Sequence, residues 1–243
     1  MSQTILVTGA SSGIGAACAR KFLYEGWQVG LFARRAAALE ALAGDAANAH
    51  VLPGDVTDAD AVAQAVAALV ARTGRLDAVF ANAGIFTPEA AIDETGLDDW
   101  ERAVSVNLTG VFLTARAAFA QMRRQVPQGG RILINGSVSA QVPRWGAAPY
   151  TATKHALTGL TKQIALDGRA LGITAGQIDI GNARSEMMDA FAARARSEGW
   201  PEPETFDVAE VARAVWHMAT LPEDTTILNM TIMAPRMPLL GRG

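Results

Sequence analysis

Short apolar runs alternate with longer segments in which apolar residues recur at helical spacing along the whole chain. Short runs rich in β-branched or aromatic residues are typical of buried strands, and the longer period is typical of helices. Strands are predicted over Gln3–Thr8, Trp27–Ala33, His50–Pro53, Leu76–Ala81, Arg131–Ser137, Ile173–Ile180 and Ile227–Met233. Helices are predicted over Gly13–Glu25, Ala36–Ala43, Pro149–Leu171 and Asp207–Thr220, with one long or two broken helices between Asp98 and about Gln125.

Strands that alternate with helices predict βαβ units, and therefore a parallel sheet covered by helices on both faces. A further helix is expected after the capping-box pattern Thr57-x-x-Asp60. We expect a single-domain, doubly wound α/β fold over 1–243, with about seven mostly parallel strands. The long stretch 181–206 is predicted to be an irregular loop that covers the substrate, and 234–243 a C-terminal tail.

The composition narrows the class of protein. Hydrophobic residues make up 50% of the 243 positions and charged residues 19%, which excludes a disordered chain. The net charge of −3 argues against a nucleic-acid partner. We see no signal peptide and no uninterrupted apolar stretch long enough for a membrane span, so a cytoplasmic protein without a membrane partner is expected. The single cysteine and three dispersed histidines predict neither an intrachain disulfide nor a metal site.

A glycine-rich turn joins the first predicted strand to the first helix. Its sequence is Thr8-Gly9-Ala10-Ser11-Ser12-Gly13-Ile14-Gly15. Glycines let the chain turn sharply and bring backbone N–H groups and a helix N-terminus against a diphosphate. The spacing G-x3-G-x-G differs from the general G-x-G-x-x-G pattern, and a plain tight turn is the alternative. Its place between a strand and a helix favours dinucleotide binding.

Two arginines follow the second strand, where an acidic residue usually binds the ribose 2′-hydroxyl of NAD. Arg34 and Arg35 stand there instead. A guanidinium pairs with a 2′-phosphate, whereas a carboxylate repels it. We therefore expect NADP(H), with Arg34 as the main contact and Ser11 or Arg35 assisting. The alternative is that both arginines are solvated at a helix start.

A tyrosine and a lysine four positions apart form the second candidate site. Tyr150 and Lys154 share one face of a predicted helix, and Ser137 ends the fifth strand at the edge where parallel strands meet their ligand. A nearby ammonium stabilises a phenolate, so we expect Lys154 to lower the pKa of Tyr150 towards the range of acid–base catalysis. Alone, this spacing is common on solvated helix faces.

Taken in order, these motifs closely resemble the short-chain dehydrogenase/reductase family from about Gln3 to Met233. The motifs that carry the resemblance are Gly9-x3-Gly13-x-Gly15, Asp55-Val56, Asn82-Ala83-Gly84, Asn107, Ser137 and Tyr150-x-x-x-Lys154. The resemblance implies that Tyr150 exchanges a proton with the substrate oxygen, Ser137 holds that oxygen, and Lys154 binds the nicotinamide ribose.

The same resemblance assigns the remaining cofactor contacts. Asn107 would hold a water in a proton relay, Asp55 and Val56 would contact adenine, and Asn82-Ala83-Gly84 would line the cofactor floor. The family usually has Pro-Gly after the sixth strand, but Ile180-Gly181 stands here. Ser185 replaces the expected threonine and keeps a hydroxyl for the nicotinamide carboxamide. Dimers or tetramers of identical chains are also implied, with the apolar tail buried on a neighbour; a disordered tail is the alternative.

The substrate is expected between the 138–148 loop and the 181–206 segment. Apolar and amide side chains there could form its pocket, or could simply pack the covering segment on the body: Gln141, Val142, Trp145, Met187, Met188, Phe191 and Trp200. Arg144 and Arg184 could meet an acidic group of the substrate, or could be solvated.

The sequence thus predicts NADPH-dependent reduction of a carbonyl compound, or the reverse oxidation. A non-catalytic NADP(H)-binding regulator on the same fold is the main alternative, and the Tyr–Lys pair counts against it. A cofactor-independent lyase or dehalogenase is disfavoured by the intact glycine loop. A serine hydrolase is disfavoured because the sequence around Ser137 lacks G-x-S-x-G.

Overall fold

One parallel sheet with helices on both faces confirms the predicted fold class. The computed structural model describes residues 2–239, apart from the side chains of residues 186, 187 and 190. Within this part of the chain, seven strands pair in the order β3-β2-β1-β4-β5-β6-β7. The strands are β1 (Thr4–Thr8), β2 (Gln28–Ala33), β3 (Ala49–Pro53), β4 (Ala78–Ala81), β5 (Gly130–Asn135), β6 (Ile173–Ile180) and β7 (Asn229–Ile232).

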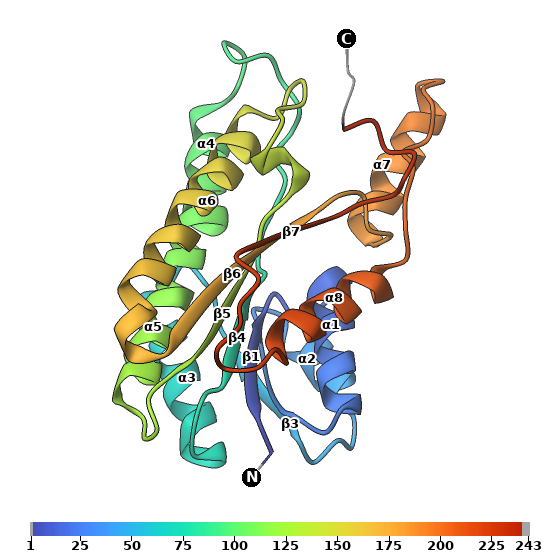
Figure 1. The fold of residues 1–243 in the computed structure, drawn as a ribbon. Helices are drawn as coiled ribbons and strands as arrows, with labels where there is room; N and C mark the ends of the chain where they lie inside the picture. Colours follow the sequence, from blue (N-terminus) through green and yellow to red (C-terminus); the bar gives the residue numbers. More distant parts are fainter. Residues whose placement is uncertain (1, 240–243) are drawn as a thin grey trace.

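Helices form a layer on each side of this sheet (Figure 1). One layer contains α1 (Gly13–Tyr24), α2 (Ala36–Ala43) and α8 (Val208–Ala219). The other contains α3 (Ala59–Thr73), α5 (Gly110–Arg124) and α6 (Ala148–Gly168). Each layer buries its own apolar cluster against the sheet, with Phe22 and Val215 in the first and Leu69 and Met122 in the second.

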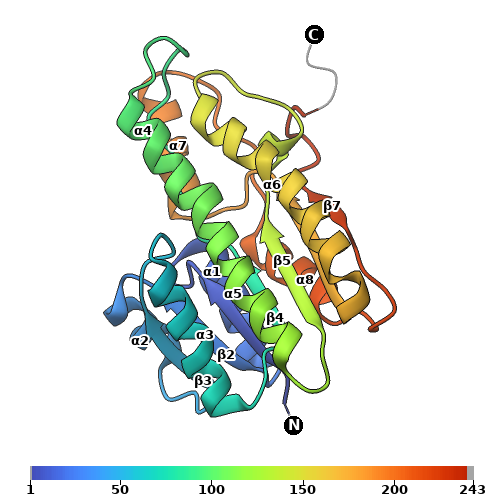
Figure 2. The ribbon, with the colours of Figure 1, turned by 90° about the vertical axis from the view of Figure 1, so that its left-hand side faces the viewer.

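The long helical region ahead of β5 is continuous but not regular. It consists of α4 (Leu97–Ala103), a π-helical segment η1 (Val104–Thr109) and α5, and Figure 2 shows α4 and α5 as one rod. By length and composition alone this rod could cross a membrane, a test that buried core helices also pass. Its residues Val111, Ala118 and Met122 pack into the core. A π segment is frequent at functional sites, and this one carries Asn107.

Two sequence expectations were wrong in this fold. The start of α3 is capped by Asp58, whose carboxylate accepts from the N–H groups of Asp60 and Ala61 at 2.9 and 3.0 Å, and not by Thr57. The side chain of Thr57 bonds to Asp55 instead. The segment 181–206 is also not an irregular loop, because it contains the helix α7 (Glu186–Ser197) with Ser185 at its N-cap.

The strand order places the carboxyl ends of β1 and β4 at the point where the order reverses. Ligands of doubly wound sheets bind in the crevice outside this point. In Figure 1, α7 stands at the same end of the sheet, beyond the carboxyl ends of the strands. A short 3-10 segment, η2 (Val138–Ala140), follows β5 at this end, whereas η3 (Arg169–Leu171) lies between α6 and the start of β6 at the opposite end.

Candidate functional site

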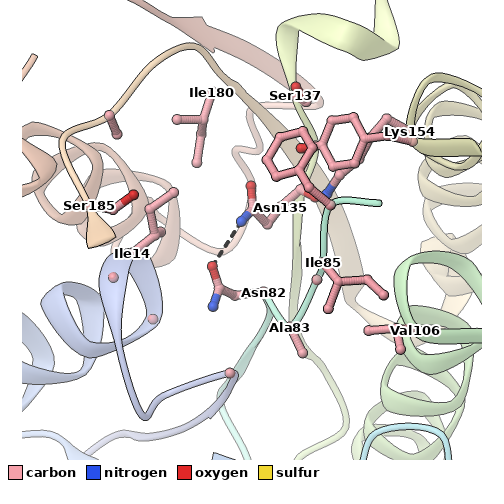
Figure 3. A pocket seen from close by; sticks show the side chains of 18 of the residues that line it. Ile14, Asn82, Ala83, Ile85, Val106, Asn135, Ser137, Lys154, Ile180 and Ser185 are labelled. Atoms are coloured by element: carbon pink, nitrogen blue, oxygen red, sulfur yellow. Dashed lines mark hydrogen bonds between the residues drawn. The ribbon is translucent and has the colours of Figure 1, made fainter. Parts of the chain in front are cut away.

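A cavity of about 800 Å³ opens at the carboxyl ends of the strands. All of the residues predicted to bind the cofactor line it: Gly9, Ser11, Ser12, Gly13, Ile14, Gly15, Arg34, Arg35, Asp55, Val56, Asn82, Ala83, Gly84, Tyr150, Lys154, Gly181 and Ser185. Of the expected catalytic residues, Ser137, Tyr150 and Lys154 line the cavity, and Figure 3 shows Ser137 and Lys154 on the same wall. One space therefore joins the glycine loop to the Tyr–Lys pair.

The glycine loop is built by close backbone approaches. A Cβ on Gly15 would lie 2.2 Å from the carbonyl oxygen of Gly9, so only glycine fits there. Gly9 and Gly13 have φ of 67° and 51°, the left-handed region that favours glycine. A Cβ on Gly13 would project towards Ser185, 3.6 Å from its Cβ.

The first turn of α1 follows this loop and has free N–H groups. The first N–H groups of a helix have no intrahelical partner. Among the described side chains, none caps α1 and no acidic residue lies in its first turn. The loop and helix end thus fit a diphosphate, which accepts hydrogen bonds and carries negative charge.

At the far end of the cavity, Arg35 is fixed against the glycine loop. Its Nε and Nη2 atoms donate to Ser11 Oγ at 3.2 and 3.1 Å. Arg34 lines the same region with no hydrogen bond or ion pair to another described residue. Asp55 turns its Oδ1 towards the N–H and hydroxyl of Thr57, both at 2.9 Å. Two guanidinium groups beside the glycine loop fit a phosphate on the adenosine ribose.

A ladder of amide groups links the strand ends beneath the middle of the cavity. Asn82 Nδ2 donates to the Thr8 carbonyl oxygen at 2.9 Å, and Asn135 Nδ2 donates to Asn82 Oδ1 at 2.8 Å (Figure 3). Lys154 Nζ then donates to the Asn135 carbonyl oxygen at 2.7 Å. The ladder joins β1, β4, β5 and α6. Sequence reasoning missed Asn135, although an asparagine at the end of the apolar run in β5 was the signal for it.

Tyr150 lies at the start of α6, and its burial has the largest effect on its pKa. Burial raises its pKa above the usual value, while a hydrogen bond with Ser137 and the charge of Arg144 act to lower it. The net shift is therefore upward, against the lowering that the sequence led us to expect. The Lys154 ammonium lies 5.5 Å from the centroid of the tyrosine ring and bonds to Asn135.

Lys154 is itself almost fully buried, and desolvation lowers its pKa to about 8. The charge of Asp179 opposes this effect. The ammonium is therefore present at neutral pH and is lost in mildly alkaline solution.

Asn107 has a structural role in this fold. Its Oδ1 accepts from the N–H of Ile85 at 2.8 Å, and its Nδ2 donates to the carbonyl oxygen of Ile85 at 2.9 Å. Both ends of the side chain are thus bonded to the loop after β4. The π segment directs Asn107 at that loop and so fixes one wall of the cavity.

Asp179 is a buried acid behind Ser137 that sequence reasoning missed. It is 1% exposed, and four N–H groups donate to its carboxylate. Oδ1 accepts from the Ser137 N–H at 3.2 Å and from Gln177 Nε2 at 2.6 Å. Oδ2 accepts from Gln141 Nε2 at 2.7 Å and from Asn229 Nδ2 at 3.1 Å. Its signal was an acid inside the apolar strand β6.

The residues expected to contact the substrate divide into two groups. Val142 and Met188 line the cavity, and the ring of Phe191 lies 5.7 Å from that of Phe86, which also lines it. Gln141 instead points at Asp179, and Trp145 is 74% exposed and lines a separate shallow hollow with His155. The side chain of Met187 lies outside the described part of the structure.

Phe86 was not expected from the sequence, yet it covers the tyrosine. The Phe86 and Tyr150 rings stack with centroids 4.0 Å apart and an interplanar angle of 23°. Arg144 contacts both Phe86 and Phe191, with Cζ 5.3 and 4.8 Å from the ring centroids. Arg184, by contrast, is exposed. The substrate end of the cavity therefore combines aromatic walls with the guanidinium of Arg144.

Ser185 and Gly181 lie between β6 and α7. The Ser185 hydroxyl accepts from the N–H of Met188 at 3.5 Å as the cap of α7, and it also borders the cavity. A Cβ on Gly181 would lie 2.8 Å from Met233 Cβ, so this glycine lets the chain pass close to the C-terminal segment. Among the described residues, no three His, Cys, Asp or Glu side chains are grouped as a metal site would need.

Comparison with known proteins agrees with this geometry. The family profile described as short chain dehydrogenase matches residues 3–195. Serine 3-dehydrogenase of Agrobacterium fabrum is 31% identical over 99% of this chain and 97% of its own length. A γ-butyrolactone 1′-reductase of Streptomyces virginiae is 37% identical over 86% of this chain and 85% of its own. A solved structure of ElxO with NADP bound is 25% identical, with a TM-score of 0.84 over 95% of this chain and 98% of that one.

Proposed function

Because the chain belongs to the short-chain dehydrogenase/reductase family, an oxidoreductase family, we propose that it interconverts a carbonyl compound and an alcohol with NADP(H). The observation that carries the proposal is the single cavity that contains both the glycine loop and the Ser137–Tyr150–Lys154 wall. A dinucleotide whose diphosphate lies at the α1 N-terminus can extend along the amide ladder towards that wall.

Bound NADPH supplies the hydride, and the side chains of the protein supply position and one proton. Ser137, which lines the same cavity as Tyr150, holds the substrate oxygen. The Tyr150 hydroxyl donates its proton to that oxygen as the carbonyl carbon gains the hydride, which yields the alcohol and leaves a phenolate. The Lys154 ammonium stabilises this phenolate until a proton from solvent restores the hydroxyl. In the reverse oxidation, the phenolate accepts the hydroxyl proton.

The first experiment replaces the proton donor. We expect Tyr150→Phe to lower kcat for carbonyl reduction by about 100- to 10,000-fold, the usual contribution of a positioned acid. NADPH binding should change little, since the ring and its packing remain. Steady-state kinetics over a panel of carbonyl compounds, beside a fluorescence titration with NADPH, measures both quantities. Full activity of the variant would reject the mechanism, and binding without turnover of any carbonyl by the natural sequence would favour the regulator.

NADP(H) over NAD(H) is proposed because two guanidinium groups flank the glycine loop. The structure of ElxO with NADP bound supports this choice as a relative of the same fold. We expect Arg34→Asp to lower the ratio of kcat/KM for NADPH to that for NADH by about 10- to 100-fold, because a charged pair is replaced by a repulsion. Arg35→Asp tests the assisting residue, with the added loss of its bonds to Ser11. An unchanged ratio in both variants would contradict the assignment.

A further inference from the structure

Arg144 is a candidate for binding part of the substrate, since its surroundings leave hydrogen-bond donors of its guanidinium without partners. It lies in the loop between η2 and α6, lines the cavity, and has a side chain that is 30% exposed. A guanidinium carries five N–H donors and no acceptor. Its one hydrogen bond to a described residue runs from Nη2 to Glu89 Oε1 and is 3.3 Å long, and its buried Nε has no partner there.

Glu89, the hydrogen-bond partner of Arg144, is shared with a second arginine. Its other oxygen, Oε2, accepts from Arg194 Nη1 at the shorter distance of 3.0 Å. The Glu89 carboxylate is therefore divided between two guanidinium groups, and Arg144 has the longer bond. An acceptor that enters the cavity would find unused donors on Arg144.

The aromatic contacts place this cation beside the reacting group. Arg144 packs on Phe86, and Phe86 stacks on Tyr150, so one ring separates the guanidinium from the ring of the proposed acid. The charge of Arg144 also acts to lower the pKa of Tyr150. A group bound by Arg144 would thus lie at the same end of the cavity as the proposed acid.

Acidic side chains elsewhere on the cavity wall do not compete with a ligand for the Arg144 guanidinium. Of the described residues that line the cavity, Asp55 is the acidic one, and it follows β3 at the opposite edge of the sheet. Val142, Pro143 and Met188, which also line the cavity, are apolar.

We propose that Arg144 binds a carboxylate of the substrate, so that the protein acts on compact oxo acids and hydroxy acids. This inference rests on the function proposed above and names its substrate class. A carboxylate matches the planar fork of a guanidinium and can accept two parallel hydrogen bonds. Phe86, Phe191 and Met188 then bound the space for the rest of the molecule.

The test compares each acid with its neutral methyl ester. Oxo acids with the carbonyl at position 2, 3 or 4, and the corresponding esters, are reduced with NADPH by the natural sequence. We expect kcat/KM to be about 10- to 100-fold higher for the best acid than for its ester, the range for hydrogen bonds to a charged group. Arg144→Gln should remove that preference by lowering kcat/KM for the acid while the ester changes less than about threefold.

Two matched variants separate recognition from structure. Glu89→Gln removes the competing carboxylate and should lower KM for the acid. Arg194→Gln removes the other guanidinium on Glu89, which is more exposed and packs on Trp200, and should not reduce the acid-to-ester ratio. Arg144→Lys should restore part of the preference, because an ammonium keeps the charge without the fork.

The outcomes distinguish this inference from the proposed function. If esters or other neutral carbonyl compounds are reduced as well as the acids, the oxidoreductase assignment stands and the role of Arg144 is rejected. An Arg144→Gln variant that loses activity equally on acids and esters would also overturn it. If no carbonyl compound is reduced, the proposed function itself fails, and this inference fails with it.

Discussion

Asp179 shows how much one buried residue can organise. Its carboxylate accepts from the backbone of Ser137 and the side chain of Gln141, at the two ends of η2, and from the side chain of Asn229 in β7. It also requires Gly136, because a Cβ there would lie 2.1 Å from Oδ1. Asp179 is a positioning residue, since it holds Ser137 without lining the cavity.

We expect Asp179→Asn to destabilise the fold and to change the titration of Lys154. An amide cannot accept from all four donors, and each buried donor left unsatisfied costs about 1–3 kcal/mol, so the free energy of unfolding should fall by about 2–4 kcal/mol. The lost charge no longer raises the pKa of Lys154, so that pKa should fall further. Urea unfolding and a pH–rate profile measure the two effects.

Asn229→Ala is the matched control for Asp179→Asn. It removes one donor from the same carboxylate but keeps the charge. It should lower stability without moving the pH–rate profile. If both variants move the profile equally, the charge of Asp179 is not the cause.

Lys154 predicts an alkaline limit to reduction. Its pKa is lowered to about 8, so the ammonium is present below pH 8 and lost as the pH rises through that value. Tyr150 has a raised pKa and keeps its proton over the same range. We expect kcat/KM for NADPH, which reports groups of the free protein, to be flat in neutral solution and to fall above about pH 8. A profile that stays flat to pH 10 would contradict this expectation.

At the scale of elements, hydrophobic periodicity predicted the sheet well. The predicted strand Ile173–Ile180 is observed unchanged, and β1 and β2 each begin one residue later than expected. Helix α2 also has the predicted bounds. These elements are buried by the sheet or lie directly on it, so their pattern of apolar residues is strict.

The helix α7 was not predicted, because its surroundings impose a weaker pattern of apolar residues. Its side chains pack on loops rather than on the sheet, with Phe191 against Phe86 and Arg194 on Glu89. Ala195 is buried, but most neighbours on the helix are exposed or half-buried. The signal that was available is Ser185 as an N-cap ahead of Glu186. The same weakness explains Gln141 and Trp145, whose loop conformation no periodicity specifies.

At the scale of the molecule, the order of the motifs along the chain predicted the site better than the number of residues between any two of them. Gly15, Asn82, Ser137 and Lys154 are far apart along the chain and meet because parallel strands bring their carboxyl ends to one edge. Two of the residues that sequence reasoning missed, Asn135 and Asp179, are polar groups inside strands. Their partners come from other elements, so only the folded chain reveals what they hold.

Because the cavity draws on both halves of the sheet, cofactor binding should stabilise the whole fold. A ligand that binds only the folded state at 100 times its Kd adds about 2.7 kcal/mol to the free energy of unfolding. For a chain of this size, that corresponds to a rise in Tm of roughly 5–10 °C. We expect NADP⁺ to produce this rise in a thermal unfolding experiment, and NAD⁺ at equal concentration to produce less.

Two variants show whether the rise in Tm comes from binding at the proposed diphosphate site. Tyr150→Phe should keep the full shift, because it removes the proton donor and not a wall of the diphosphate site. Gly13→Ala should lose most of the shift, because the added Cβ enters the proposed diphosphate site. The nearest neighbour of that Cβ, at 3.6 Å, leaves room for the chain to fold. The left-handed φ makes Gly13→Ala less stable without ligand, so each shift is compared with the variant's own baseline. An equal shift in Gly13→Ala and the natural sequence would place the dinucleotide elsewhere.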